Sequence, residues 1–286
     1  MIHPFPGRTC GFGFGLEQPW ESREWHEQIR QSLERVATLR TQVVAMAERE
    51  YGEWHNPDLT ETMPAGRTLV SKYWRGGVRR TVSDGDLAST TWQDANPWSA
   101  AFISYVMREA GAGSEFPYAS AHAAYIRAAI DNRLNQVRSI FQGFRLVERA
   151  LELGDIIARS REHSGATYDT VRRGMLTHCD IVTELEPASG VVRAIGGNVH
   201  QNVDRKTLSM DTDGHLTTPG YFAVIKMDPV IPSLRASPCP VHSVDACDDT
   251  FSRSWRTPGI VNCLPGEGAF DPAGFGRCTC DPEIPW

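Results

Sequence analysis

Long apolar runs are absent from this sequence of 286 residues. No stretch approaches the roughly 20 consecutive apolar residues that a membrane-spanning helix requires, so we predict no membrane span. Residues 1–15 are rich in glycine and lack the apolar segment of a signal peptide. Three routes stay open: the chain remains inside the cell, its signal has been removed, or its export follows another path.

Clustered positive charge is also lacking. The formal net charge is −6 and the isoelectric point is about 5.9, whereas proteins that bind nucleic acid or anionic membranes carry grouped Lys and Arg. We therefore expect neither partner. Hydrophobic residues at 41% and charged residues at 22% are typical of a globular protein with a sizeable core. Internal repeats and low-complexity tracts are absent as well.

Metal-ligand spacing is missing too, because neither His200 nor His242 has a suitably spaced carboxylate nearby. We predict no metal and no other cofactor. Cysteines, by contrast, are concentrated in a tail rich in Pro, Gly and Asp, which favours disulfides in an oxidising compartment. A zinc site is the alternative, although the C-x-C pair lacks the usual spacing. The tail cysteines are Cys239, Cys247, Cys263, Cys278 and Cys280.

Residue periodicity predicts an α+β fold in which helices come first and an antiparallel sheet follows. Helical spacing covers residues 21–54, 98–110 and 120–131. The β-rich runs are 156–158, 181–185, 191–195 and 221–227, and turn residues separate them. A further strand is expected near residues 68–74. We divide the chain into an N-terminal arm with an amphipathic helix (1–58), a central domain (59–230) and a Cys-rich C-terminal extension (231–286).

Ser99 is the candidate nucleophile. It lies in the run Asn96-Pro97-Trp98-Ser99-Ala100-Ala101, at the start of the apolar helix 98–110. A serine there commonly caps the helix by accepting from free backbone N–H groups. The functional interpretation is that the positive end of the helix dipole favours the anion that develops on a nucleophile.

His178 is the best candidate for the base, although a lone histidine on a strand is often structural. Imidazole near its neutral pKa can accept a hydroxyl proton and return it to a leaving amine. Strand alternation places Asp180 on the same face as His178. Asn198 comes close to His178 if residues 178–186 and 191–199 pair as a hairpin. Either Asp180 or Asn198 is then the group that orients the imidazole.

These segments resemble the CHAP amidases and NlpC-type hydrolases, which are papain-like. The matching blocks are Trp98-Ser99-Ala100-Ala101-Phe102, Gly154-Asp155, His178-Cys179-Asp180 and Gly196-Gly197-Asn198. The chain is most similar to the family called domain of unknown function 2272, over roughly residues 60–230. Two departures stand out: Ser99 replaces the usual cysteine, and Gly196 replaces a glutamate.

The resemblance implies a papain-like core, in which the helix that carries the nucleophile packs on an antiparallel sheet that carries the histidine. It also implies hydrolysis of amide bonds in peptidoglycan. Without a visible signal peptide, such an enzyme would be secreted or delivered to the bacterial periplasm as an antibacterial toxin, with an immunity protein as its partner in the producing cell. Candidate substrate-binding residues beside the nucleophile are Asp94, Trp98, Tyr118 and His122, of which His122 is also an alternative catalytic group.

Two other functions stay open. The serine in place of cysteine and the missing glutamate fit a wall-binding module that kept the fold and lost the chemistry. An amide hydrolase or acyltransferase that acts on a protein or a small molecule is the third hypothesis.

Overall fold

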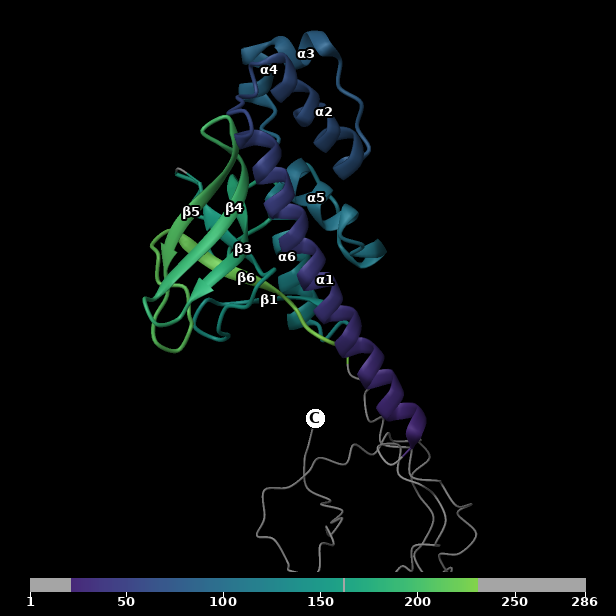
Figure 1. Ribbon diagram of the computed structural model, residues 1–286. Helices are drawn as coiled ribbons and strands as arrows, with labels where there is room; N and C mark the ends of the chain where they lie inside the picture. The colour runs from purple at the N-terminus through teal and green to yellow at the C-terminus, as the bar shows by residue number, and fades with distance from the viewer. Residues whose placement is uncertain (1–21, 162, 231–286) are drawn as a thin grey trace, which may run out of the picture. The chain divides into compact units, whose positions relative to one another are not determined.

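The computed structural model of the protein describes residues 22–161 and 163–230, which fall in one compact unit (Figure 1). The predicted disulfide tail therefore lies outside the described residues. Helices come first and strands follow, which confirms the α+β prediction. The helices are α1 (Arg23–His55), α2 (Pro64–Val78), α3 (Asp84–Ala88), α4 (Thr90–Ala95), α5 (Ser99–Glu109) and α6 (His122–Leu134), with a short 3-10 turn, η2 (Gly113–Glu115).

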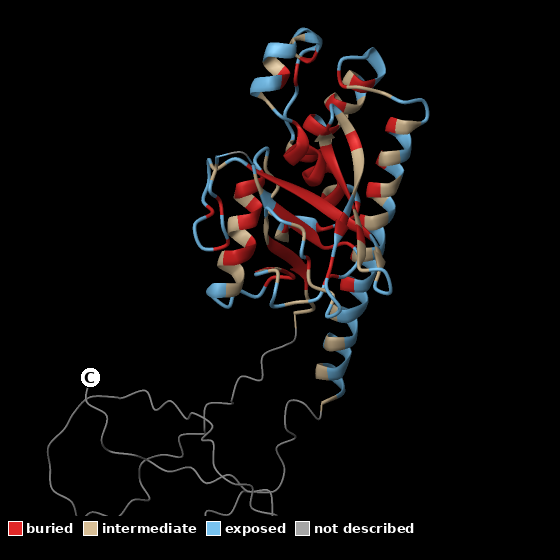
Figure 2. Ribbon diagram, turned by 90° about the vertical axis from the view of Figure 1, so that its left-hand side faces the viewer, coloured by how far each residue is buried: buried red, intermediate tan, exposed pale blue. Residues whose placement is uncertain are grey.

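The strands form one antiparallel sheet of six, in the order β1-β6-β2-β3-β4-β5. Apolar side chains cover both faces. One face packs against the helices, and the other carries a second apolar cluster formed by the strands and their connections. Figure 2 shows how burial concentrates in the strands. The strands are β1 (Phe141–Phe144), β2 (Ile156–Ser160), β3 (Thr177–Glu186), β4 (Val191–Val199), β5 (Asn202–Ser209) and β6 (Tyr221–Met227).

Helix α1 runs along the helical side of the sheet and packs against α5, β3 and β5. Its buried side chains recur every three or four residues from Val36 to Trp54, as in an amphipathic helix. The turns before Val36 are mostly exposed. The later part of α1 thus belongs to the same apolar core as the sheet.

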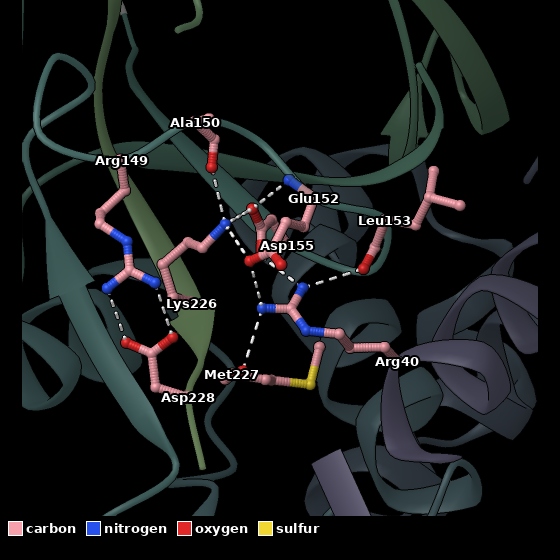
Figure 3. A network of polar contacts seen from close by, with 9 residues as sticks. All are labelled: Arg40, Arg149, Ala150, Glu152, Leu153, Asp155, Lys226, Met227 and Asp228. Carbon is pink, nitrogen blue, oxygen red and sulfur yellow. Dashed lines mark hydrogen bonds and ion pairs between the residues drawn. The ribbon is translucent and has the colours of Figure 1, made fainter. Parts of the chain in front are cut away.

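A cluster of buried charges fastens α1 to the sheet (Figure 3). The Asp155 carboxylate is 0% exposed and accepts from Arg40 Nη1 at 2.8 Å and Lys226 Nζ at 2.7 Å. Arg40 also donates to the carbonyl of Met227, and Lys226 donates to that of Ala150. Burial raises the pKa of Asp155, against the opposing effect of the two cations. One carboxylate thereby joins α1, β6 and the start of β2.

The expectation of a strand near residues 68–74 is wrong, because this segment lies within α2. The buried positions of α2 are Gly66, Val70, Tyr73, Trp74 and Gly77, and their spacing of three and four residues places them on one helical face. The β-forming character of Val, Tyr and Trp is overridden by this tertiary packing.

Candidate active site

Helix α5 places Ser99 in the interior of the protein. Pro97 disfavours a helical conformation at Asn96, so α4 ends there and a new helix begins at Ser99. Ser99 is 2% exposed. Trp98 occupies the N-cap position and makes no side-chain cap. The Ser99 hydroxyl lies 2.7 Å from Nε2 of His122 instead of capping the helix.

His122 is the first residue of α6, so two helix N-termini meet at this contact. Its other ring nitrogen, Nδ1, is hydrogen-bonded to the hydroxyl of Tyr125, one helical turn later. The Cys179 thiol is a neutral neighbour of this pair, because burial raises its pKa well above the usual value. In the tautomer that carries its proton on Nδ1, His122 donates to the Tyr125 hydroxyl. Nε2 then carries the lone pair and accepts from Ser99.

The surroundings of His122 keep its imidazole neutral. Burial lowers its pKa well below the usual value, and the nearby His178 lowers it further, while Asp180 acts in the opposite direction. The positive ends of the α5 and α6 dipoles disfavour the imidazolium in the same way. Tyr125 is also neutral, because burial raises its pKa well above the usual range. Ser99, His122 and Tyr125 thus form an uncharged chain of hydrogen bonds.

Asp180 is the centre of a second, charged group. Its carboxylate is 0% exposed and accepts from His178 Nε2 at 3.0 Å, Lys206 Nζ at 2.7 Å and the Tyr221 hydroxyl at 2.8 Å. Burial opposes a charge there, but His178 and Lys206 outweigh it and hold the pKa of Asp180 well below its usual range. The prediction that His178 and Asp180 share one face of the strand is confirmed.

Strand register explains why these polar groups fit inside the sheet. β3 and β4 pair from Ile181↔Ile195 to Glu186↔Val191, so residues 177–180 have a strand partner only in β2. Gly196 lies beside them, and a Cβ there would come within 2.1 Å of Asp180 Oδ1. At Gly197 a Cβ would lie 2.5 Å from that of Phe102 in α5. One glycine makes room for the carboxylate and the other allows β4 to approach α5.

The uncharged and charged groups are neighbours. The imidazole rings of His122 and His178 lie 5.2 Å apart between centroids and are tilted by 58°. Burial lowers the pKa of His178 as well, although Asp180 raises it. One nucleophile candidate, two neutral histidines and one carboxylate therefore gather where α5, α6 and β3 meet.

The structure brings only some of the predicted site residues together. It places His122 at the hydrogen-bond distance from Ser99 that we expected for His178. Asn198 has a left-handed backbone, with φ of 53°, at an irregularity in β4, and no hydrogen bond to His178 is found between these two described side chains.

The remaining candidates lie away from the Ser99 hydroxyl. Trp98 is 0% exposed, stacks on Trp54 and donates to Glu61, so it is a core residue and not part of a substrate surface. Tyr118 lies under Arg108, near the opposite end of α5, and lines a hollow of about 680 Å³. Asp94 is exposed in α4.

Two partners of Asp180, Lys206 and Tyr221, were not predicted. Both lie on strands and carry no local motif, so only the strand register brings them to the carboxylate. The role of Tyr125 had a signal, because it follows His122 by three residues and so shares its helical face.

A group of potential metal ligands lies outside this site. Asp211, Asp213 and His215 offer ligand atoms within 4.8 Å of one another. Oδ1 of Asp211 accepts from the backbone N–H groups of the other two, and these bonds close the turn after β5.

Among the described helices, none has the length and apolar character needed to cross a membrane.

Comparisons with known proteins leave the function open and identify the family. No curated protein and no solved structure matches the chain significantly. One family does match, over residues 63–255, a span that includes α2, every strand among the described residues and all the residues of the two groups around Ser99 and Asp180. The chain belongs to this family, which is described as "Uncharacterized protein conserved in bacteria (DUF2272)".

Proposed function

We propose that the protein is a serine hydrolase that cleaves amide bonds in peptidoglycan. The observation that carries the proposal is the contact of 2.7 Å between Ser99 Oγ and His122 Nε2 at the start of a buried helix. Nucleophilic catalysis in general requires a nucleophile and a base within hydrogen-bond reach, and a third group that holds the base. His122 takes the role of base that the sequence indicated for His178.

The acylation step follows from these contacts. Ser99 Oγ attacks the amide carbon while its proton passes to His122 Nε2, and His122 then protonates the leaving amine. The first backbone N–H groups of α5 have no acceptor within the helix. They and the helix dipole stabilise the oxyanion of the tetrahedral intermediate. Tyr125 keeps the imidazole in the tautomer that accepts from Ser99.

The substrate class comes from the family resemblance. A helix that begins with the nucleophile and packs on an antiparallel sheet is also the arrangement of a papain-like core. On this proposal the enzyme works in the periplasm or at the cell wall, as an effector directed against other bacteria, and the producing cell needs an immunity protein.

Digestion of purified sacculi tests the nucleophile. We expect the wild-type protein to release muropeptides, measured by chromatography, and Ser99→Ala to release none. The matched control is Ser104→Ala, which removes a buried serine of the same helix whose hydroxyl bonds the backbone of Ala119. Equal release by wild type and Ser99→Ala would reject Ser99 as the nucleophile.

The second candidate is a peptidoglycan-binding module without catalysis. The exposure of Ser99, only 2%, favours it, because a substrate reaches that hydroxyl only after neighbouring groups move. This alternative predicts that the protein sediments with sacculi and releases no fragments at any concentration. It also predicts that a fluorophosphonate probe leaves Ser99 unmodified, whereas a working hydrolase is labelled at this residue.

A further inference from the structure

The two ring nitrogens of His178 lie in different environments. Nε2 is bound to Asp180 Oδ1 at 3.0 Å, so this nitrogen carries the proton and donates it to the carboxylate. Nδ1 therefore carries the lone pair. Nδ1 makes no hydrogen bond with any described side chain or backbone group, and it is not fully buried. The side chain is 6% exposed, which leaves Nδ1 as the ring nitrogen that solvent reaches.

His122 lacks this freedom. Both of its nitrogens are occupied, one by Ser99 and the other by Tyr125. Neither partner carries a charge, so nothing in direct contact stabilises a proton that stays on His122. His178, in contrast, touches a carboxylate that is charged at any pH at which the protein would work.

We propose that His178 is a second general base, which activates the water that hydrolyses the acyl group on Ser99. This inference rests on the proposed serine hydrolase and assigns the second half of its reaction. His122 serves the attack by Ser99, and His178 serves the attack by water. The site thus needs two histidines, because His122 is hydrogen-bonded to the nucleophile and His178 has a ring nitrogen that a water molecule can reach.

The proton balance of this second step closes. The water oxygen forms a bond to the acyl carbon while one water proton moves to His178 Nδ1. The tetrahedral intermediate then collapses, and the bond between the acyl carbon and Ser99 Oγ breaks. The proton that His178 Nδ1 took from water is returned to Ser99 Oγ, which leaves as a hydroxyl, so His178 becomes neutral again, and His122 carries no extra proton in this step. No oxidant, metal or cofactor takes part.

The charges around His178 suit a base that becomes cationic for a short time. Asp180, in direct contact, favours the imidazolium, while Lys206 and Arg161 disfavour it. Among the other neighbours, Cys179 and Tyr125 are neutral, because burial raises the pKa of each. Tyr221 and Lys206 fix the carboxylate from β6 and β5, and they act as positioning residues.

Stopped-flow hydrolysis of p-nitrophenyl acetate tests the inference. In His178→Gln, whose amide can still donate to Asp180, we expect a burst of about one equivalent of p-nitrophenolate. Steady turnover should then be at least about 100-fold slower than in the wild type, which is the usual contribution of a general base. Mass spectrometry should show the acetyl group on the peptide containing Ser99, and hydroxylamine should remove it, because a strong nucleophile needs less help from a base.

Two further variants separate the possible outcomes. His122→Gln should show neither burst nor adduct, because acylation itself is lost. Tyr221→Phe removes one hydrogen bond to Asp180 and should slow turnover while the burst stays unchanged, which keeps the test valid if His178→Gln misfolds. Two outcomes would overturn the role of His178 and leave the proposed hydrolase intact. One is turnover at the wild-type rate in both His178→Gln and Tyr221→Phe. The other is loss of the burst in a folded His178→Gln. A wild type that never acylates Ser99 would overturn the proposed hydrolase and this inference together.

Discussion

At the scale of single residues, Gly196 has no room for a side chain. In Gly196→Ala the new Cβ would lie only 2.1 Å from Asp180 Oδ1, so the carboxylate and His178 must move. We expect a loss of about 1–3 kcal/mol in the free energy of unfolding, the usual cost of overpacking a core. Urea unfolding followed by circular dichroism measures it.

The control is a glycine with free space around it. Gly52 lies in α1, and a Cβ there meets nothing within 4 Å. Gly52→Ala should therefore stabilise the protein by about 0.5–1 kcal/mol, since alanine loses less backbone entropy than glycine in a helix. If both variants lose similar stability, the close contact with Asp180 is not the cause.

The two buried histidines give stability a defined dependence on pH. Burial lowers the pKa of His122 and of His178 in the folded state, whereas an unfolded histidine titrates near pH 6.5. The unfolded chain therefore binds protons first, and stability falls as the pH drops below about 6.5. Each histidine contributes a slope of at most about 1.4 kcal/mol per pH unit.

Chemical unfolding at pH values from 8 to 5 tests this dependence. The wild type should keep constant stability in the upper part of the range and lose it in the lower part. His178→Gln, with one titrating group fewer, should lose less on acidification. The same slope in both proteins would show that His178 does not cause the loss.

Sequence reasoning identified Ser99, His178, Asp180 and His122, and it placed His178 beside Asp180, but it did not give the contact between Ser99 and His122. Local patterns place a serine at a helix start and a histidine and an aspartate on one strand face. Which histidine reaches Ser99 depends on how α6 is oriented against α5. The spacing of apolar residues along the sequence does not predict this orientation. Lys206 and Tyr221 were missed because strand pairing, not sequence proximity, brings them to Asp180.

At the scale of elements, the amphipathic helices were predictable because their apolar spacing is long and regular. α1 and α5 lie within two residues of their expected bounds. β1 and β5 were not expected. β1 has only four residues, and β5 carries Asp204, Arg205 and Lys206 in its middle, so neither shows the apolar pattern of a strand.

The cluster around Asp155 adds to the apolar attachment of α1 to the sheet. Asp155→Ala leaves Lys226 buried, at 1% exposure, without its buried counter-charge. Removing one partner of a buried ion pair costs about 3–5 kcal/mol. The free energy of unfolding from urea titration should fall by this amount.

The neighbouring ion pair is the matched control (Figure 3). Asp228 pairs with Arg149, whose side chain is 41% exposed, and solvent-exposed pairs contribute little. Asp228→Ala should therefore cost less than about 1 kcal/mol. Equal losses in the two variants would contradict the special role of the buried carboxylate.

At the scale of the whole molecule, the part of α1 after residue 35 is needed for folding although the family match begins at residue 63. Val43, Ala47 and Trp54 are completely buried in the core. Loss of a buried tryptophan alone costs about 3–5 kcal/mol, and a typical domain is stable by only about 5–15 kcal/mol. A chain that lacks residues 1–58 should therefore fail to unfold cooperatively on heating.

A shorter deletion provides the comparison. Within the described residues, removing 1–33 takes away only turns of α1 that precede its first buried residue, Val36, so we expect the melting transition to remain cooperative. Cooperative melting of the chain without residues 1–58 would show that the core closes without α1.

The ion cluster around Asp155 also bears on how the chain folds. Arg40 contacts Asp155 and Met227, which lie 115 and 187 positions further along the chain. Closing such long loops costs entropy, so contacts of this kind form late. Interactions absent from the folding transition state slow unfolding and leave the folding rate almost unchanged. The cluster therefore governs how long the native state lasts, and local helix formation governs how quickly that state is reached.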